Sequence, residues 1–404
     1  MTRVIESSRA PILLSEGFRF FFFAGPVYAI VAMLIWLGWL GIHAAGAVAT
    51  YVPFSQPPQQ WHAHEMIFGY GGAVLAGFLL TAVPNWTGVK ASPATFITSL
   101  AALWLTGRLA VLFSTELPAA LVMIVDIAFI PVLGANILVN LLKRPKPQNM
   151  LFLILLAMMT AGNAAVHLEW MGAASETSTG GLRMGLLTLA AMIAVLGGRV
   201  TPGFTRNAMV RAGIETGLPS SRGWLDGIGI SSAILLAPLA AIDPGDTILA
   251  VVAAIAAVSN GLRLSGWRTL AVLDQPILWS LHLGFAMLAA GYGLLALHWF
   301  GLGFSEAAAL HVVAIGAIGG MTIAVMSRAT LGHTGRPLTV PKAIAGAYAL
   351  VALAALVRSA GVVLAPQHYF TMMFLAGGLW VAAFVIFIAV YAPIVMSPRL
   401  QKSE

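Results

Sequence analysis

WHAHEMIFGYGGAVLAGFLLTAVPNW, residues 61–86, begins with two histidines and a glutamate and then continues to Trp86 without another charged residue. An apolar run of this length is enough to cross the hydrocarbon of a bilayer as an α-helix. Ionisable side chains inside a membrane are rare and mark functional sites, because a buried charge is costly there. The stretch therefore predicts a transmembrane helix that carries a functional site near its beginning.

The whole chain has the composition of a membrane protein. Of its 404 residues, 59% are hydrophobic and 9% are charged, whereas soluble domains carry about 25% charged residues. The mean hydropathy is +0.92. We predict an all-α, polytopic integral membrane protein that forms a single transmembrane domain over residues 1–404. The twelve expected spans cover about residues 18–42, 62–84, 93–113, 118–142, 149–168, 181–200, 225–241, 246–264, 276–296, 304–326, 341–364 and 370–396.

Basic residues alternate along the predicted loops. They gather at the N-terminus and in every second connection, and the intervening loops contain essentially none. This is the positive-inside pattern, which predicts cytoplasmic N- and C-termini. The net charge of +7 thus reflects topology and contact with membrane lipid, and it requires no nucleic-acid partner. The residues that define the pattern are Arg3, Arg9, Arg19, Lys90, Lys143, Arg144, Lys146, Arg199, Arg206, Arg211, Arg222, Arg263, Arg268, Arg328, Arg336, Lys342, Arg399 and Lys402.

Three arginines depart from this alternation. Arg108, Arg183 and Arg358 each lie near the predicted outer end of a span. Long basic side chains extend from such positions to the headgroups. The alternative is that one or two of them pair with a buried anion such as a haem propionate.

Histidine is the metal-ligand type that the chain offers in number, because it has nine histidines and no cysteine. Imidazole suits iron, copper and zinc. The histidines in or beside apolar spans are the candidate metal ligands: His62, His64, His282, His311 and His333. His167 lies four residues after Asn163, and for this pair we expect a hydrogen-bonded contact at a helix end.

His62, His64 and Glu65 form the densest polar group. A spacing of two places the histidine side chains about 200° apart on a helix, so they face different directions unless His62 precedes the regular helix. Glu65 lies three residues after His62 and is in reach of it. A carboxylate orients a ligating histidine in many metal sites, and a carboxyl at the membrane boundary is also suited to relay protons. Glu65 is the catalytic candidate.

The predicted depths of the histidines do not suit one compact site. His64 lies near the outer surface, His311 in the outer half of its span, His282 in the inner half, and His333 nearer the cytoplasm. Straight helices cannot bring them all together. Either the protein has two sites, or some helices are broken or tilted.

Cytoplasmic arginines are candidates for holding an anionic cofactor. Arg199 and Arg206 lie in the run GRVTPGFTRN, residues 198–207, which combines cations with hydroxyls and suits propionates, a quinone or an oxyanion. Arg328 and Arg336 flank His333 in the same way. Positive-inside topology explains all four without a ligand. Asp126, within the fourth span, indicates either a hydrated path or a hydrogen bond between helices.

Four motifs resemble the NnrS family over nearly the whole chain. They are WHAHEMIFGYGGAVLAGFLLTAVPNWTG (61–88), GGRVTPGFTRNA (197–208), LHLGF (281–285) and HVVAIGAIGGMTIAVMSRATLGHTGRP (311–337). The resemblance implies a bacterial inner-membrane protein that contains a b-type haem and copper and responds to nitric oxide and nitrosative stress. All five motif histidines are present. Phe285 stands where family members often have tyrosine, so this chain lacks that hydroxyl.

The resemblance does not fix the reaction. The first hypothesis is an oxidoreductase that reduces nitric oxide to N2O, with His64, His282 and His311 holding the cofactor and membrane quinol as the electron donor. The second is a non-catalytic haem or metal protein that senses or binds nitric oxide. The third is a secondary transporter, since twelve helices with cytoplasmic termini also suit carriers.

Overall fold

The computed structural model describes residues 11–400, and these residues form helices and connecting loops with no strand. Twelve helices within that range are long and apolar enough to cross a membrane, which confirms the predicted all-α, polytopic architecture. Arg3, Arg9 and Lys402, which contribute to the predicted charge pattern, lie outside the described residues.

Nine spans are single α-helices, and the last of them follows a short 3₁₀ turn. Three spans change to π-helix along their length. The nine are α1 (Gly17–Ala44), α4 (Ala94–Leu112), α5 (Ala119–Leu142), α6 (Pro147–Trp170), α7 (Ser178–Arg211), α8 (Gly223–Ile242), α9 (Asp246–Ser265), α10 (Pro276–Trp299) and η6 (Pro366–His368) with α15 (Tyr369–Val395). The three are α2 (Pro58–His64) with η2 (Glu65–Gly71) and α3 (Gly72–Thr87); α11 (Glu306–His311) with η4 (Val312–Gly319) and α12 (Gly320–His333); and α13 (Lys342–Leu356) with η5 (Val357–Gly361) and α14 (Val362–Leu364).

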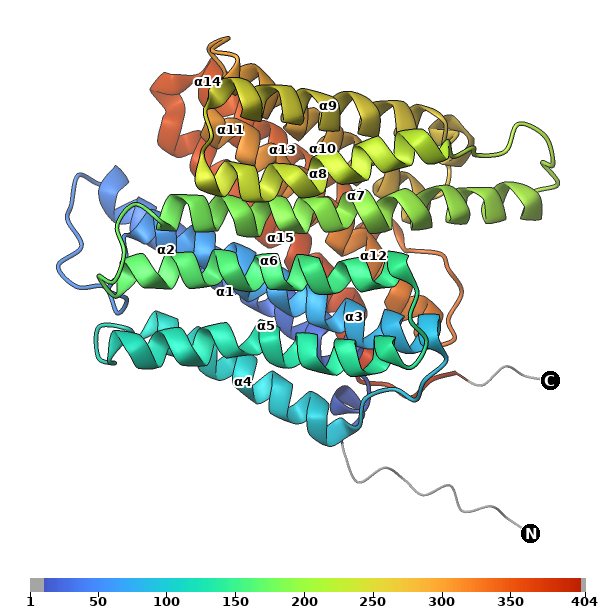
Figure 1. The fold of residues 1–404 in the computed structure, drawn as a ribbon, viewed down its shortest axis with the longest axis horizontal. Coiled ribbons are helices and arrows are strands. Elements are labelled where there is room, and N and C mark those ends of the chain that lie inside the picture. The colour runs from blue at the N-terminus through green and yellow to red at the C-terminus, as the bar shows by residue number, and fades with distance from the viewer. Residues whose placement is uncertain (1–10, 401–404) are drawn as a thin grey trace.

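Consecutive helices are neighbours through the middle of the chain. Figure 1 shows α4 to α9 side by side in chain order, and α9 continues the series by packing on α10. Helices that are distant in the chain also pack together, since α1 lies against both α3 and α15. The most buried spans are Pro58–Thr87, Ser178–Arg211 and Glu306–His333. Two of these three central spans carry the histidine motifs.

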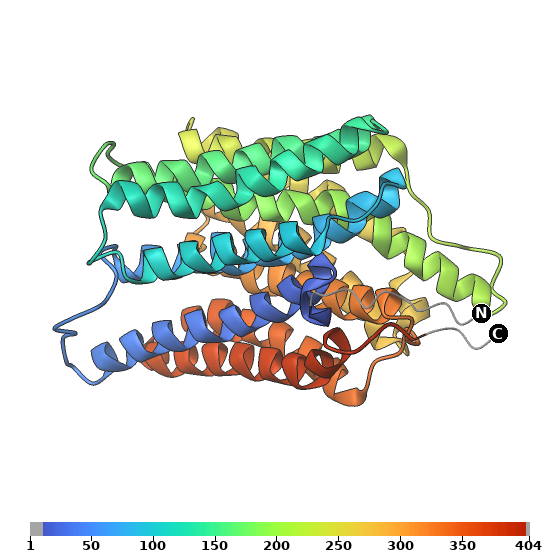
Figure 2. The same cartoon turned by 90° about the horizontal axis from the view of Figure 1, so that it is seen from below.

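The bundle has two ends, which we name by the chain termini. At the termini end α1 begins and α15 ends (Figure 2), and the Arg19 guanidinium donates a hydrogen bond of 2.8 Å to the Val395 carbonyl there. The far end holds the C-terminus of α1 and the N-terminus of α2. Successive spans run in opposite directions, so the end of the bundle at which each helix begins follows from the chain order. Each candidate residue can therefore be placed nearer to one end or the other.

Two helices run further than the sequence predicts. The expected loop over about 201–224 is half helical, since α7 continues through Pro202 to Arg211. Proline removes one backbone hydrogen bond, but its φ angle is compatible with a helix. Similarly, α12 continues to His333, which lies beyond the predicted span at about 304–326. At both places the last turns of the helix carry polar residues. Hydropathy therefore predicts where the apolar run ends and does not predict where the helix ends.

Glycines let α6 and α7 approach closely. A Cβ added at Gly162 would lie 2.8 Å from the Gly181 carbonyl oxygen and 3.2 Å from the Gly185 nitrogen, which are backbone atoms and cannot turn aside. Small residues have this role in membrane helix packing generally.

We therefore expect Gly162→Ala to destabilise the protein by about 1–3 kcal/mol, because overpacking forces the two backbones apart. The matched control is Gly227→Ala in α8, where an added Cβ meets nothing within 4 Å. That change is expected to be neutral or slightly stabilising, since alanine favours helix. Thermal unfolding in detergent measures both, and equal melting temperatures for the two variants would contradict the packing role of Gly162.

Candidate functional site

A cavity of about 560 Å³ lies at the far end of the bundle. Its walls come from α1, α2, η2, α7, α11, η4, η5 and α15, and most lining side chains are apolar or aromatic. Its volume is within the range of about 300–1,000 Å³ that is usual for small-molecule and cofactor sites. This cavity is hereafter the histidine cavity.

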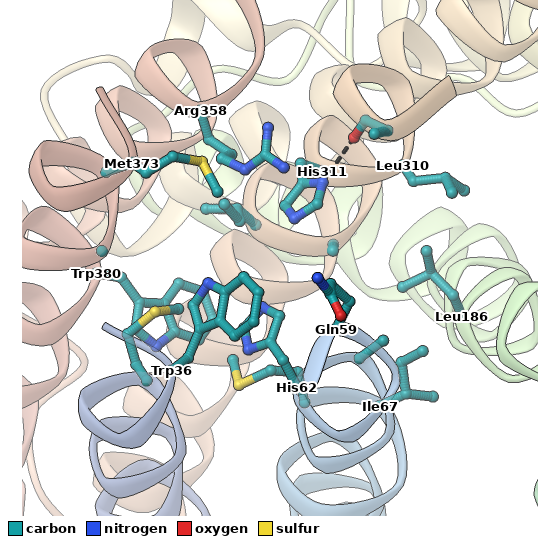
Figure 3. A pocket seen from close by; sticks show the side chains of 18 of the residues that line it. Trp36, Gln59, His62, Ile67, Leu186, Leu310, His311, Arg358, Met373 and Trp380 are labelled. Atoms are coloured by element: carbon teal, nitrogen blue, oxygen red, sulfur yellow. Dashed lines mark hydrogen bonds between the residues drawn. The ribbon is translucent and has the colours of Figure 1, made fainter. Parts of the chain in front are cut away.

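Two of the predicted ligands, His62 and His311, meet in this cavity (Figure 3). Nδ1 of His311 lies 2.6 Å from the Ala307 carbonyl oxygen one turn earlier and donates its proton to it. Nε2 therefore keeps its lone electron pair free. A backbone carbonyl fixes the tautomer of many metal-ligating histidines in this way. The ring of His311 is thus held ready to accept a metal or a proton.

His62 stacks its ring on a tryptophan, and one of its ring nitrogens has no hydrogen-bond partner among residues 11–400. Its ring lies parallel to the Trp36 indole, with centroids 4.7 Å apart and an interplanar angle of 15°. Its buried Nδ1 has no hydrogen-bond partner within residues 11–400. A buried polar atom without a partner costs about 1–3 kcal/mol. The arrangement favours a ligand that supplies the missing contact.

Arg358 contributes a positive charge to the same cavity. It lies on η5 beside His311 in Figure 3, and it forms no ion pair with any carboxylate in the part of the chain that the structure describes. The other arginine of the lining, Arg183, is neutralised by Glu306, whose carboxylate is 2.7 Å from its guanidinium. An unpaired cation among membrane helices favours an anionic ligand group.

All three π-helical segments of residues 11–400 contribute to this cavity. Segment η2 follows His64, η4 follows His311, and η5 contains Arg358. Such segments are rare, cost helix stability and occur frequently at functional sites. In each span the widened turn lies next to a polar residue of the site.

A second polar group lies outside the cavity and is fully buried. Glu65 Oε1 is 2.7 Å from the Arg108 guanidinium and 2.8 Å from Nδ1 of His64. Tyr28 also donates to Glu65, and Arg108 pairs with Asp126. Two carboxylates therefore share one arginine in the interior of the helix bundle. We call this set the buried charge cluster.

His167 extends the cluster through Asp126. Nε2 of His167 is 2.9 Å from Asp126 Oδ2, and Asn163 donates to the same oxygen at 2.8 Å. His64 Nε2 lies 3.2 Å from that oxygen. The ligand atoms of His64, Asp126 and His167 all lie within 4.8 Å of one another, which gives a buried His–Asp–His group that could hold a metal ion. Its donor atoms are already engaged: Asp126 bonds Arg108 and Asn163, so a cation would have to displace existing contacts.

The structure separates the predicted residues into several places. His62 and His64 diverge, as their spacing requires, and Glu65 contacts His64 instead of His62. His282 is held between the hydroxyls of Thr205 and Thr269 at 2.8 and 2.9 Å, outside the histidine cavity. The remaining predicted residues lie at the termini end: His333 with its ring 5.5 Å from Phe18, Arg328 with its guanidinium 3.6 Å from the centroid of the Phe204 ring, Arg336 beside the Thr334 carbonyl, and Arg199 and Arg206 at a different cavity.

Sequence reasoning assigned no site role to His167 and left the role of Asp126 open. Two features of the sequence point to these residues: Asn163 and His167 are one helical turn apart, and Asp126 is an isolated carboxylate within a span. Their meeting depends on how α5 and α6 are rotated against each other. Of the arginines outside the charge pattern, Arg108 and Arg183 pair with carboxylates, and Arg358 faces the cavity.

Fold and site together define an integral membrane protein of twelve helices, with histidine-bearing spans at its centre. The chain matches the family described as NnrS protein over residues 12–399, and it belongs to this family. Membership fits a role in the nitric oxide response. No curated protein matches the chain.

Proposed function

We propose that this protein is a haem- and copper-containing NnrS protein of the bacterial inner membrane, with cytoplasmic termini, that reduces nitric oxide to N2O in the histidine cavity. The observation that carries the proposal is the convergence of His62, His311 and Arg358 on one cavity. Two imidazoles have nitrogen atoms without protein partners, and the arginine has no counterion within residues 11–400.

The residues present fit a haem and a copper ion. His62 and His311 would ligate metal through nitrogen, and Arg358 would pair with a propionate. Indole rings of Trp36 and Trp380 provide flat apolar walls. The cavity is also lined by the thioethers of Met33, Met66 and Met373, which are soft ligands of the kind that Cu(I) prefers. When bound, the haem and copper would supply the redox chemistry.

The reaction takes up protons and electrons as well as substrate. Two NO molecules, two protons and two electrons give one N2O and one water, with membrane quinol as the proposed electron donor. The chain contributes a largely apolar cavity that would hold two small molecules together, and this would remove much of the entropic barrier to their coupling. Glu65 is the proposed proton-relay group, because it lies next to Met66 of the cavity wall and its carboxylate accepts hydrogen bonds from Tyr28 and His64, whose protons it would take up and pass on.

The test is made on detergent-purified protein from cells grown with ample haem precursor and copper. Absorption spectra of the oxidised and reduced forms, before and after NO, are compared with iron and copper contents of the same sample. N2O is then measured with NO and a quinol. Haem with N2O production supports the reductase. Haem that shifts with NO but yields no N2O indicates a sensor or binder. Metal-free, colourless protein contradicts the proposal and favours a carrier.

Glu65→Gln is expected to retain bound haem and to slow NO consumption by about 100-fold, as loss of a general acid–base group does. The amide oxygen still accepts from Arg108, and Arg108 keeps Asp126, so the fold is expected to survive.

The matched control for this variant is Glu169→Gln at the same end of the bundle, where the carboxylate accepts from Ser178 outside the cluster. Haem content and turnover are measured on both variants. Unchanged turnover in Glu65→Gln would remove Glu65 from the reaction.

A further inference from the structure

A second cavity, of about 410 Å³, lies at the termini end of the bundle. It is formed by the last part of α7, the loop before α8, the first turns of α8 and the end of α9. Three arginines line it, namely Arg199, Arg206 and Arg263, and the one acidic residue of its lining is Asp226. We call it the arginine cavity. It lies at the opposite end from His62 and His311, so its arginines do not belong to the histidine cavity.

The wall contributed by α7 is one face of the helix. Arg199, Pro202, Gly203 and Arg206 have the spacing i, i+3, i+4 and i+7, which places all four on the same side. A Cβ added at Gly203 would meet nothing within 4 Å. The two arginines thus stand one above the other with a proline and a glycine between them, and the short side chains leave room for a ligand.

The charges of the cavity do not balance. Arg263 is neutralised, since its Nε lies 2.6 Å from Asp226 and its Nη1 donates to the Ala194 carbonyl at 2.9 Å. Arg199 donates only to the Gln148 carbonyl, at 3.2 Å. Neither Arg199 nor Arg206 forms an ion pair with a carboxylate of residues 11–400. The arginine cavity therefore carries two uncompensated guanidinium charges.

The depth of this cavity matches the headgroup layer. Helix α7 has 34 residues, which corresponds to about 51 Å at 1.5 Å per residue, whereas the hydrocarbon is about 30 Å thick. Arg199 is 21 residues beyond Ser178 at the helix start, or about 31 Å along the axis. If α7 enters the hydrocarbon at Ser178, the face from Arg199 to Arg206 lies at the level of the phospholipid phosphates on the other side.

We propose that the arginine cavity is a binding site for a phosphate group, held by Arg199 and Arg206. Guanidinium binds phosphate through paired hydrogen bonds as well as charge. Two sources present this chemistry: the headgroup of an anionic phospholipid, which enters from the bilayer, and a small soluble phosphate, which enters from water. Basic pockets between membrane helices bind anionic headgroups in other proteins. The proposal does not depend on haem, copper or nitric oxide.

The variant that tests the site is the double substitution Arg199→Gln with Arg206→Gln in the full chain. The matched control is Arg144→Gln with Arg211→Gln, which removes the same charge at the same end of the bundle from residues that are exposed, as Arg199 and Arg206 are, but lie outside the cavity. Because Arg199 and Arg206 bond no other side chain of residues 11–400, the double variant is expected to fold.

The lipid arm adds phosphatidylglycerol or phosphatidylcholine to delipidated protein in detergent and counts bound lipid by native mass spectrometry, with the melting temperature as a second readout. The soluble arm adds inorganic phosphate or chloride at equal ionic strength. We expect phosphatidylglycerol to bind in preference to phosphatidylcholine, and the cavity variant to bind it about tenfold or more weakly, as the loss of charged hydrogen bonds implies. The control variant is expected to stay within about twofold, because neither Arg144 nor Arg211 lines the arginine cavity and an isolated exposed charge contributes little.

Each outcome decides between the sources or against the site. Selective binding of phosphatidylglycerol that is lost in the cavity variant supports a lipid site. Stabilisation by inorganic phosphate that is lost in the same variant supports a soluble phosphate. The proposal is overturned if binding is weakened equally in the cavity and control variants. It is also overturned if neither phosphatidylglycerol nor inorganic phosphate binds to or stabilises the wild type.

Discussion

Replacing His311 by alanine is expected to remove most of the bound haem or metal from the purified protein. His311 offers Nε2 to the cavity because Nδ1 is committed to the Ala307 carbonyl, 2.6 Å away. Substituting residues that merely orient a ligand weakens metal affinity about 10–100-fold, so losing a ligand itself is expected to cost about 100-fold or more. The absorption spectrum and the iron and copper contents of the variant measure the loss directly.

His62→Ala is expected to have the same effect, whereas two other histidines serve as controls. His368 is exposed and lies outside the histidine cavity. His282 is buried, but Thr205 and Thr269 occupy both of its ring nitrogens. His368→Ala and His282→Ala are therefore expected to keep the cofactor. If His62→Ala and His311→Ala retain wild-type haem and metal, the histidine cavity is not the cofactor site.

The sequence predicts the membrane architecture well because hydropathy acts locally. A run of apolar residues between polar loops must cross the bilayer whatever its neighbours are. The same signal fails at α7 and α12, whose last turns leave the membrane as helix and carry polar residues. Within those turns the helix is maintained by its own hydrogen bonds and by packing, as where Arg328 covers Phe204.

The candidate site is less predictable, because it depends on contacts between helices distant in sequence. Spacing alone predicts that His62 and His64 diverge. It does not predict that His62 faces α11 and His311, or that His64 faces α5 and Asp126. These pairings follow from the rotation of each helix about its axis, which is set by close packing such as that of Gly71 against Leu189. The glycine faces of the two histidine-bearing spans are covered by neighbouring helices, as where Trp380 packs on Gly319.

The buried charge cluster leads to the second large effect. Arg108 is the one arginine of residues 11–400 that pairs with Glu65 and Asp126, and both carboxylates are fully buried. Removing one partner from a buried ion pair costs about 3–5 kcal/mol, because the remaining charge has no water to solvate it. Here two charges would be left. By contrast, Arg183 pairs with Glu306 near the mouth of the histidine cavity, where both side chains retain access to solvent.

Arg108→Met is therefore expected to destabilise the protein by at least about 3–5 kcal/mol and to lower the yield of folded material severely. Arg183→Met, the control, is expected to change stability by about 1 kcal/mol or less. Combining Arg108→Met with Glu65→Gln and Asp126→Asn removes the unpaired charges together with the arginine, and this triple variant is expected to recover much of the lost stability. Unfolding in detergent and the monodisperse fraction on size exclusion compare all three. An Arg108→Met variant as stable as Arg183→Met would show that the two carboxyl groups are not ionised in the folded protein, and the triple variant would then give no rescue.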